Sequence, residues 1–551
     1  MRMRGGGRAT AVWAAAVCAV LLSPTAGAQT KHHVKVDKKA QKKTENKIAR
    51  EEAAPGGADQ FAKRADDILG VEPVSKGEWG LLIADAETGE TLYEQNAANY
   101  FVPASNMKLF TTALALEKLG LDYRFHTTLE STGTVSPEGE LSASLVLVGR
   151  GDPNLSNRKF PFELKEEFDG PPEKVLAELA DELVAKGMKT IYGDVIGDDS
   201  YFPRERYPNG WEVDDMVWEY GAAISALIVN DNTATVTLTP GQNAGEPVAV
   251  GVAPPTREFM VVSTVLTSPA AVKADLTLTR EPGSHLVSIS GNLPEKSAAR
   301  KLVLAIEEPA QHAAELLREL LVQRGVSISG VARAQHESLA DGKGGTGVAG
   351  GGGREVLAEH VSVPVRDSVK LVNKISQNLH TEVLLRTAMR QTGTWNAPDE
   401  LTKFAAEFYA KAGIAPEDVM QTDGSGLSRH DLATPRAIVT LLRYAQARPW
   451  FGAYYASLPV AGIDGTLEER MKNTPAAGRV HAKTGSVEHV RSMSGFADTA
   501  GGRRLVFSFM ANNQAGKKHE TTDALGALCV AMMEEFNSEP AKRAHEHKRP
   551  H

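Results

Sequence analysis

Residues 103–108 read Pro-Ala-Ser-Asn-Met-Lys, and they run directly into Leu-Phe-Thr-Thr-Ala-Leu-Ala-Leu at 109–116. A proline just ahead of an apolar run and a glycine just after it, here Gly120, are typical of the two ends of a helix. The stretch therefore predicts an apolar helix over residues 104–119, with a serine and a lysine at its head. We expect the rest of the fold to be arranged around this helix.

Ser105 and Lys108 are three residues apart, so on a helix they share one face and the amine can reach the hydroxyl. Ser105 would also lie at the positive end of the helix dipole. A serine hydroxyl with a base within reach is the arrangement of an activated nucleophile. The structural alternative is a helix-capping serine followed by a solvated lysine, which gives the same S-x-x-K pattern.

A second S-x-x-K match, from Ser156 to Lys159, shows how little this pattern means alone. It lies between Asp152-Pro153 and Pro161, and no apolar helix follows it. We expect a polar loop at this second match.

Two more short motifs follow the first one along the chain. Ser376-Gln377-Asn378 falls inside a long helical pattern over 368–389, and Lys483-Thr484-Gly485 falls at the end of a predicted strand over 479–483. Another S-x-N, at 290–292, only ends a β-like run. A helix-borne S-x-x-K, then S-x-N, then a strand-borne K-T-G resembles the signature of penicillin-binding proteins and serine β-lactamases.

The motifs supply the groups that acyl transfer through a serine needs. Lys108 can act as a base only if its pKa falls to about 7–8, and burial or a second cation such as Lys483 would lower it. Ser376 would relay the proton to the leaving amine, and Asn378 would hold the substrate backbone. The backbone N–H groups of Ser105 and Ser486 would form the oxyanion hole.

The K-T-G strand predicts how the substrate binds. Lys483 and Thr484 suit a terminal carboxylate on the substrate. A strand that ends at Gly485 could pair with an extended peptide, and the glycine would leave room for its close approach.

The spacing of the motifs narrows the resemblance. Residues 109–375 separate Lys108 from Ser376, which is enough to insert one or two domains into the catalytic one. From about residue 60 to 536 the chain resembles the low-molecular-mass class C penicillin-binding proteins, the D-alanyl-D-alanine carboxypeptidase/endopeptidase family. Further stretches strengthen the resemblance: 149–153, 197–202, 225–227, 230–232, 423–429 and 464–467.

The resemblance also implies a pocket for the side chain of a diamino acid on the substrate. An aspartate would bind the ammonium group and an arginine the carboxylate. By type and position the pocket residues are Trp211, Asp215 (or Asp214 in its place), Tyr220, Ser425 and Arg429. Two residues depart from the family pattern: Asp431 stands where Asn is frequent, and Ser486 where Thr is common.

The predicted fold is α/β (α+β): a penicillin-binding, serine β-lactamase-like catalytic domain, with an antiparallel sheet flanked by helices, interrupted by two smaller domains. We expect the catalytic domain at 58–127 and 355–536 and the insertion at 128–354, with an inner β-rich part at about 200–300. Residues 176–196 and 316–331 repeat a helix–Gly–strand–Gly–strand pattern, which predicts two halves of one layered domain.

The two ends have a different composition from the rest. Residues 1–28 have the charged, apolar and small-residue regions of a secretory signal, and 29–57 read as a basic disordered linker. The tail 537–551 is polar, and we expect it to be disordered. Removing the signal leaves one cysteine, Cys529, so the mature chain would have no internal disulfide, and we expect no transmembrane segment in it. The net charge of −8 does not indicate a nucleic-acid binder.

These observations predict an exported serine D,D-peptidase, periplasmic or cell wall-associated, that needs no cofactor or metal. Its substrates would be peptidoglycan stem peptides ending in D-Ala-D-Ala, and β-lactams would acylate the same serine. Two alternatives stay open: a serine β-lactamase, with Glu469 to Asn473 as its only candidate deacylation motif, and a non-catalytic envelope-binding protein. The balance of carboxypeptidase and endopeptidase activity, the preferred diamino acid and the oligomeric state are not predicted.

Overall fold

The computed structural model of the chain describes residues 57–165, 167–281, 283–337, 353–393 and 400–538. The predicted signal segment 1–28, the linker 29–57 apart from its last residue, and the tail from 539 onward lie outside the described residues.

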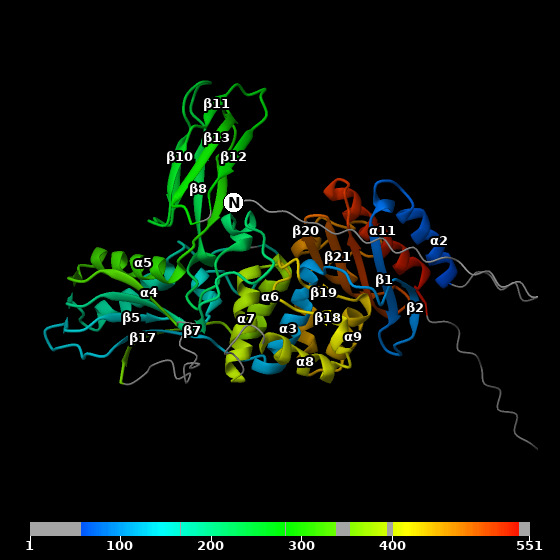
Figure 1. The fold of residues 1–551 in the computed structure, drawn as a ribbon, viewed down its shortest axis with the longest axis horizontal. Helices are drawn as coiled ribbons and strands as arrows, with labels where there is room; N and C mark the ends of the chain where they lie inside the picture. Colours follow the sequence, from blue (N-terminus) through cyan, green and yellow to red (C-terminus); the bar gives the residue numbers. More distant parts are fainter. Residues whose placement is uncertain (1–56, 166, 282, 338–352, 394–399, 539–551) are drawn as a thin grey trace, which may run out of the picture. The chain divides into compact units, whose positions relative to one another are not determined.

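A five-stranded antiparallel sheet is the centre of the part of the molecule in which the sequence predicts the catalytic domain (Figure 1). Its strands follow the order β2 (Thr91–Gln95), β1 (Glu78–Asp85), β22 (Arg504–Asn512), β21 (Val490–Asp498), β20 (Val480–Val487). The N-terminal and C-terminal parts of the chain meet where β1 pairs with β22 along its whole length. Strand β20 forms one edge of the sheet.

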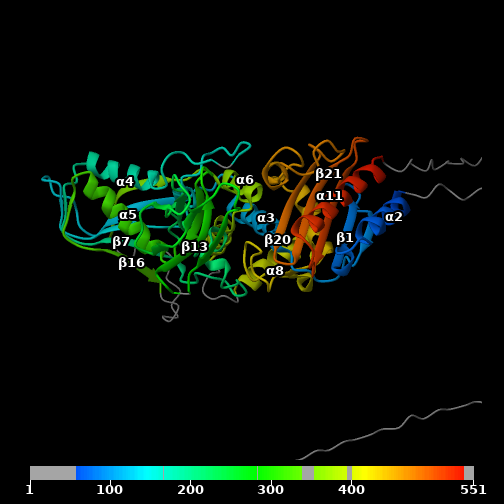
Figure 2. The same cartoon turned by 90° about the horizontal axis from the view of Figure 1, so that it is seen from above.

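Helices cover both faces of this sheet, so its central strands are apolar on both sides. Leu81 and Ile83 of β1 face a core shared with α2 (Gly57–Leu69) and α11 (Lys518–Glu535). Leu82 and Ala84 face the opposite core, which α3 and α6–α10 complete (Figures 1 and 2). The bounds of the second group are α3 Met107–Leu119, α6 Val365–Ile375, α7 Asn378–Gln391, α8 Glu400–Ala412, α9 Pro435–Gln446 and α10 Phe451–Ser457. The predicted fold class is confirmed.

Helix α3 lies within the core, as its sequence predicts. It follows a short 3-10 turn, η2 (Ala104–Asn106), and ends at Gly120, whose φ of 85° suits a glycine. Every residue from 107 to 116 is buried, including Lys108. A helix that is apolar all round is typical of a protein core, and here one buried residue of the helix is a lysine, Lys108.

The outer part of the insertion is a layered α/β unit. Its main sheet has the order β16 (Ala332–Glu337), β7 (Val195–Pro203), β5 (Leu145–Val148), β3 (His126–Ser131), β17 (Glu355–Val361). A small sheet orders β15 (Ser327–Ile328), β6 (Thr190–Ile191) and β4 (Glu140–Leu141), and helices α4 (Lys174–Ala185) and α5 (Pro309–Gln323) pack beside them. The two copies of the predicted repeat pair in parallel, β15 with β6 and β16 with β7.

The inner part of the insertion is rich in β-structure and has its own apolar core. One sheet orders β14 (Arg300–Ala305), β8 (Thr233–Thr239) and β9 (Ala249–Ala253). The other contains β10 (Met260–Ser263), β13 (Leu286–Pro294), β11 (Leu266–Ser268) and β12 (Asp275–Thr279).

Strand pairing bears on the expected domain boundaries at 127/128 and 354/355. Strand β17 comes after the expected end of the insertion, yet it pairs with β3 in the sheet of the insertion. Since a strand belongs to the sheet that satisfies its backbone hydrogen bonds, we propose that the insertion runs from about 126 to 361.

Two local predictions were wrong. The helical pattern over 368–389 is interrupted at Ser376, which has a left-handed backbone (φ 63°, ψ 40°) and caps α6, and the Gln377 side chain then caps α7. The apolar pattern continues across this break, so periodicity does not reveal it. Strand β20 continues to Val487, so Lys483-Thr484-Gly485 lies within the strand rather than at its end.

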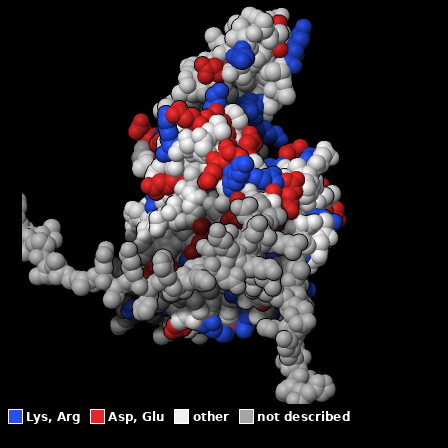
Figure 3. Space-filling model, turned by 90° about the vertical axis from the view of Figure 1, so that its right-hand side faces the viewer, with Lys and Arg blue, Asp and Glu red and all other residues white. Residues whose placement is uncertain are grey.

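Charged side chains of both signs intermingle on the face shown in Figure 3. Within the described residues, no helix has both the length and the apolar composition needed to cross a membrane.

Candidate active site

The three sequence motifs meet at one place. Ser105 lies on turn η2, Lys108 on the first turn of α3, Ser376 and Asn378 at the junction of α6 and α7, and Lys483 on β20. Lys108 Nζ lies 3.1 Å from Ser105 Oγ and 2.6 Å from Asn378 Oδ1. Lys483 Nζ donates to Ser376 Oγ at 2.9 Å. Both amines therefore face the same group of hydroxyl and amide side chains.

The backbone just before Ser105 adopts an unusual conformation. Ala104 has a φ of 49°, a region that residues with side chains rarely occupy. Two glycines allow the chain to pack against this turn: a Cβ on Gly426 would lie 1.9 Å from the Ala104 carbonyl oxygen, and one on Gly485 would lie 2.7 Å from that of Pro103. Strain of this kind persists where the surrounding structure fixes it, often at functional sites.

The structure gives Gly485 a packing reason to be glycine, and its predicted role beside the substrate stays a prediction. The space where its side chain would be is filled by Pro103 and by Ser492, whose hydroxyl donates to the Pro103 carbonyl at 2.7 Å. The glycine of K-T-G lets β20 approach the turn that carries Ser105.

Lys108 is held by three oxygen atoms. Besides Ser105 Oγ and Asn378 Oδ1, its Nζ lies 2.7 Å from the carbonyl oxygen of Ser425. A neutral amine has two N–H groups and one lone pair. The carbonyl and the amide oxygen can only accept hydrogen bonds from it, so the lone pair is left for the third partner, the Ser105 hydroxyl, which can donate. The two acceptors thus orient the base toward the nucleophile.

The surroundings of Lys108 favour its neutral form. The side chain is fully buried, and burial is the largest cause that lowers its pKa from 10.5 to about 8. The negative charges of Asp423, Glu382 and Asp431 oppose this shift without contacting the amine. A pKa of about 8 lies close to the range in which a general base works best at neutral pH.

Lys483 is also fully buried. Burial and then the positive charge of Lys108 lower the pKa of Lys483 well below its ordinary value. From the sequence we expected the reverse effect, in which the charge of Lys483 lowers the pKa of Lys108. A carboxylate that enters the site would restore the charge on Lys483, since a nearby opposite charge favours the ionised form.

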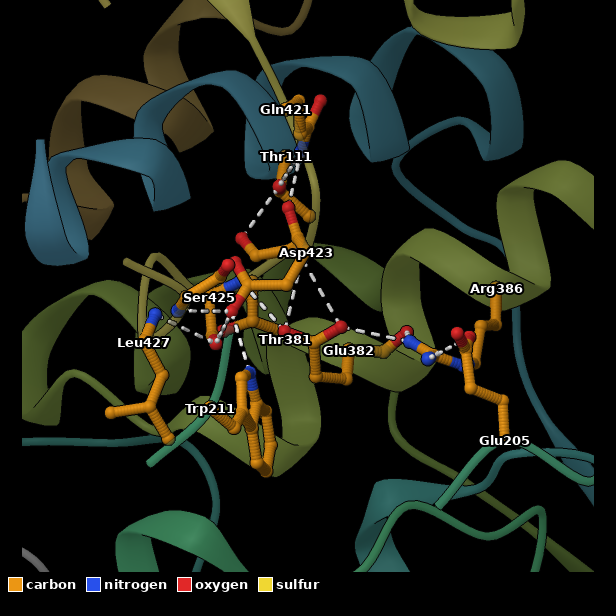
Figure 4. A network of polar contacts seen from close by, with 12 residues as sticks. Thr111, Glu205, Trp211, Thr381, Glu382, Arg386, Gln421, Asp423, Ser425 and Leu427 are labelled. Atoms are coloured by element: carbon orange, nitrogen blue, oxygen red, sulfur yellow. Dashed lines mark hydrogen bonds and ion pairs between the residues drawn. The ribbon is translucent and has the colours of Figure 1, made fainter. Parts of the chain in front are cut away.

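The loop that supplies the Ser425 carbonyl is fixed by buried carboxylates (Figure 4). Glu382 accepts hydrogen bonds from the backbone N–H groups of Gly424 and Ser425, at 3.0 and 2.8 Å. Asp423 accepts from the N–H groups of Gly426 and Ser428, at 2.6 and 2.8 Å. Carboxylates that accept several backbone N–H groups hold a loop in one conformation.

The same network ties this loop to the insertion. The Trp211 indole N–H donates to Asp423 Oδ2 at 2.8 Å, and Arg386 bridges Glu382 and Glu205 at 2.8 and 3.1 Å (Figure 4). Sequence reasoning missed Glu382: it lies one turn beyond Asn378 on α7, and nothing in that helical pattern distinguishes it from a surface glutamate.

The outer edge of β20 presents backbone groups to the cavity. The Ala482 N–H donates to the Pro459 carbonyl, away from β21, at 2.9 Å. Because N–H groups along a strand alternate between its two edges, those of Thr484 and Ser486 face the same outer side. The Ser105 N–H is among the first of its helical segment, where no intrahelical acceptor exists. Ser105 and Ser486 both line the cavity described next, and the assignment of their N–H groups as oxyanion donors stays a prediction.

Residues of all three motifs line a cavity of about 620 Å³. From the predicted set it contains Ser105, Ser376, Asn378, Thr484, Ser486, Asp214, Asp215, Tyr220 and Arg429. Thr484 Oγ1 lies 2.7 Å from Thr466 Oγ1, on the loop before β20. Within the described residues, no group of three or more His, Cys, Asp or Glu side chains could hold a metal ion.

The charged side chains of the predicted side-chain pocket lie together at one end of this cavity. Burial and the neighbouring Glu212 raise the pKa of Asp215, whose carboxylate is hydrogen-bonded to the Tyr220 hydroxyl. Burial and Asp215 raise the pKa of Tyr220 to about 12. Arg429 pairs with Glu212 at 3.1 Å and donates to the Glu488 carbonyl at 2.7 Å.

Trp211 and Ser425 do not line the cavity. Both are buried, Trp211 against Asp423 and Ser425 beneath Lys108. Both residue types suit a polar pocket as well as a buried network, so residue type alone could not separate the two roles.

Asp431 occupies the position where the family frequently has Asn, and its carboxylate makes contacts with the backbone of the neighbouring loop. Its Oδ1 accepts the N–H groups of Thr422 and Asp423 at 2.6 and 3.3 Å, which preserves the loop geometry. Burial, and then Asp423, raise the pKa of Asp431 well above its ordinary value.

Known proteins resemble the chain over most of its length. The model of the D-Ala-D-Ala carboxypeptidase 3 (S13) family matches residues 61–531. A D-alanyl-D-alanine carboxypeptidase from an Actinomadura species is 34% identical over 451 residues, which cover 79% of this chain and 78% of that protein. A penicillin-sensitive carboxypeptidase A from Dictyostelium discoideum is 28% identical over 490 residues, 83% and 87% of the two chains.

A solved structure has the same fold. Penicillin-binding protein 4 from Haemophilus influenzae superposes with a TM-score of 0.71 at 23% identity. The match covers 86% of this chain and 99% of that one, so it includes the insertion as well as the catalytic part.

Proposed function

The chain belongs to the D-Ala-D-Ala carboxypeptidase 3 (S13) family, and on this premise we propose that Ser105 is the nucleophile that cleaves the terminal D-Ala-D-Ala bond of peptidoglycan stem peptides. The predicted family and the predicted class of enzyme, a serine-type carboxypeptidase, are confirmed by this membership. The observation that carries the assignment of Ser105 is the contact of its hydroxyl with a buried lysine that no carboxylate within the described residues neutralises.

In the proposed acylation step the Ser105 proton passes to Lys108 while Oγ attacks the carbonyl of the penultimate D-alanine. The negative charge that develops on the carbonyl oxygen is met by the N–H groups of Ser105 and Ser486. Each such donor is worth about 3–4 kcal/mol of transition-state stabilisation. Asn378 Oδ1 and the Ser425 carbonyl keep the base oriented through this step.

The C–N bond then breaks, and the leaving amine needs a proton. The proton that Lys108 took from Ser105 would reach this amine through the Ser376 hydroxyl, which also accepts a hydrogen bond from Lys483 Nζ at 2.9 Å. Thr484 and Lys483 would hold the carboxylate of the departing D-alanine. Water then attacks the acyl-enzyme, which frees Ser105 and the shortened stem peptide.

We assign the diamino-acid side chain of the substrate to the end of the cavity with Asp215, Tyr220 and Arg429. The Asp215 carboxylate suits an ammonium group, and the Arg429 guanidinium suits a carboxylate. Asp214 lines the same cavity and is exposed, so it is the weaker candidate for the ammonium group. Trp211 would act indirectly, through the loop at 423–428.

β-Lactams would acylate Ser105, and they would be released slowly. The β-lactamase alternative needs a base that activates the deacylating water. Its candidate, Glu469, is exposed, pairs with Lys472 at 2.8 Å and is not part of the cavity lining. The substrate is a component of the cell envelope, so the enzyme would act after export, consistent with the signal-like segment at 1–28.

The proposal is tested with purified protein and a stem pentapeptide. Wild type should release D-alanine and should be labelled covalently by fluorescent penicillin, with a label that persists for much longer than a turnover. Rapid loss of the label would favour a β-lactamase, and absence of both activities would favour the non-catalytic alternative.

A further inference from the structure

Two basic side chains that line the catalytic cavity have no role in the proposed mechanism. Arg491 lies on β21, where it pairs with Ser486 of β20, and Lys518 is the first residue of α11. Both line the cavity together with Val487 and Glu488, at the end where β20 turns into β21. Lys518 is exposed and Arg491 is partly buried.

The start of α11 is tied to the hairpin formed by β20 and β21. His489 lies in the turn of this hairpin, and its carbonyl accepts a hydrogen bond from the Gln514 N–H at 3.0 Å. His489 Nδ1 also lies 2.9 Å from the Gln514 carbonyl oxygen. Gln514 comes just ahead of α11, which then packs beside β21 (Figures 1 and 2). The two cations therefore come from separate segments that meet at this end of the cavity.

Within the part of the chain that the structure describes, neither Lys518 nor Arg491 is neutralised by an ion pair. Arg491 Nη1 donates to two carbonyl oxygens of the hairpin, those of Val487 and Val490, at 2.6 and 2.5 Å, while its buried Nε has no partner among the described residues. Glu488 also lines this end, with 71% of its side chain exposed, so two cations face one solvated carboxylate. Because Lys518 begins α11, the positive end of the helix dipole adds to its charge. This end of the cavity therefore favours an anion.

The proposed mechanism sets the direction of the substrate along β20. The terminal carboxylate of the substrate lies at Thr484, and its scissile carbonyl oxygen faces the Ser486 N–H. Toward its own N-terminus the substrate therefore runs past Val487 to the turn of the hairpin, antiparallel to β20.

The diamino acid comes directly before the penultimate D-alanine, and its carboxylate is assigned to Arg429. Arg429 donates to the Glu488 carbonyl at 2.7 Å, so the diamino acid would lie level with the turn of the hairpin. The residue before the diamino acid would then pass the end of the hairpin, where Arg491 and Lys518 line the cavity.

We infer that Lys518 and Arg491 bind the free carboxylate of the glutamate residue that precedes the diamino acid in the stem peptide. This inference rests on the proposed function and adds a second point of recognition to the same site. The glutamate is joined to the diamino acid through its side-chain carboxyl, so its α-carboxylate stays ionised unless it is converted to an amide. Lys518 would follow this carboxylate on its flexible stem, and Arg491, which the hairpin holds in place, would donate a guanidinium N–H to it. The site would make the enzyme select stem peptides with a free carboxylate over amidated ones.

The test uses two stem pentapeptides that differ only in this carboxylate, which is free in one peptide and amidated in the other. The readout is the ratio of their kcat/KM values for D-alanine release. A loss of folded protein lowers both values by the same factor and leaves the ratio unchanged. Wild type should cleave the free form about fivefold better than the amidated form. Lys518→Ala should reduce the ratio to about two, and Lys518→Ala combined with Arg491→Gln should reduce it to about one.

The matched control is Lys517→Ala. Lys517 is an exposed lysine next to Lys518 in the sequence, and it does not line the cavity. Its replacement removes the same charge from the same end of α11 and should keep the wild-type ratio. A ratio that falls as far as in Lys518→Ala would mean that the general field of the lysines, and not a contact, selects the substrate, and it would overturn the inference.

Two further results would overturn the inference while leaving the proposed function intact. Wild type could cleave both peptides equally well, or the variants with Lys518→Ala could keep the wild-type ratio. A ratio that is kept while both peptides are cleaved more slowly would assign the two cations to a group that the peptides share. Wild type that neither binds penicillin nor releases D-alanine from either peptide would instead refute the proposed function itself.

Discussion

Two S-x-x-K stretches occur in this chain, and the structure gives them opposite properties. In the first, Lys108 is fully buried and its Nζ lies 3.1 Å from Ser105 Oγ. In the second, Lys159 is exposed and pairs with Glu167 at 2.6 Å. In this second stretch the serine, Ser156, is the buried residue. Its Oγ accepts a hydrogen bond from the Asp231 N–H at 3.1 Å and lies 3.4 Å from His380 Nε2.

The difference lies in the surroundings of the lysine. Burial lowers the pKa of Lys108 to about 8, whereas the hydrogen bond to Glu167 raises the pKa of Lys159. An apolar helix removes the first lysine from water, and a polar loop leaves the second in it. On the proposed assignment, the motif supplies a nucleophile where the fold deprives the lysine of both water and a counter-ion.

Replacing the serines should show the largest contrast. We expect Ser105→Ala to lose D-alanine release by at least about 10⁴-fold, because no other hydroxyl can form the acyl-enzyme. Ser156→Ala should keep the activity of wild type but lose about 1–2 kcal/mol of stability, since the buried Asp231 N–H loses its acceptor. Turnover assays and denaturant unfolding measure the two effects. The reverse pattern would mean that the roles of the two stretches have been exchanged.

Replacing the lysines should show the next largest contrast. Lys108→Met removes the base and keeps an unbranched apolar side chain in the core, so acylation by penicillin should slow by about 10²–10⁴-fold. Lys159→Met should leave the acylation rate unchanged. Stopped-flow measurement with a fluorescent penicillin gives both rates. Normal acylation by Lys108→Met would show that another group takes the proton.

The pH dependence sharpens the contrast further. Acylation requires neutral Lys108, so below its pKa of about 8 the rate should fall about tenfold per pH unit. Above that pH the rate should level off. Lys159→Met should give the same curve as wild type, because an ion-paired surface lysine takes no part. A rate that does not change between pH 6 and pH 8 would contradict the assignment of Lys108 as the base.

The smallest effect is expected from the buried acids near Lys108. Glu167 forms a direct ion pair with Lys159, whereas Asp431 influences the pKa of Lys108 without contacting it. Burial, and then Asp423, raise the pKa of Asp431, and an amide would keep the acceptor oxygen that the Thr422 and Asp423 N–H groups use. Asp431→Asn should then change kcat/KM by less than about threefold and leave the melting temperature within a few degrees of wild type. A large loss of either would show that the ionised carboxylate is required.

Much of this organisation could be predicted from the sequence. The helix with Ser105 and Lys108, the antiparallel strands and the internal repeat follow from local patterns such as apolar runs and glycine stops, whereas the insertion was predicted from the spacing of the motifs and the family resemblance. The order of the three motifs predicts that the first S-x-x-K carries the chemistry, and its serine and lysine contact one another in the structure.

Other features depend on tertiary contacts that no local pattern records. The left-handed turn at Ser376 interrupts an otherwise continuous helical pattern, and nothing in that pattern marks the position. Gly485 makes room for the backbone of Pro103, which is far away in the sequence. The buried positions of Trp211, Ser425 and Glu382 follow from one polar network that joins two separate segments of the chain.

The most direct test of the account is to locate the penicillin adduct. Wild-type protein is incubated with benzylpenicillin, digested, and analysed by peptide mass spectrometry. The account predicts a single acylated peptide, the one that contains Ser105, and no adduct on the peptide that contains Ser156. An adduct on Ser156, or an intact protein that never gains the mass of the drug, would contradict it.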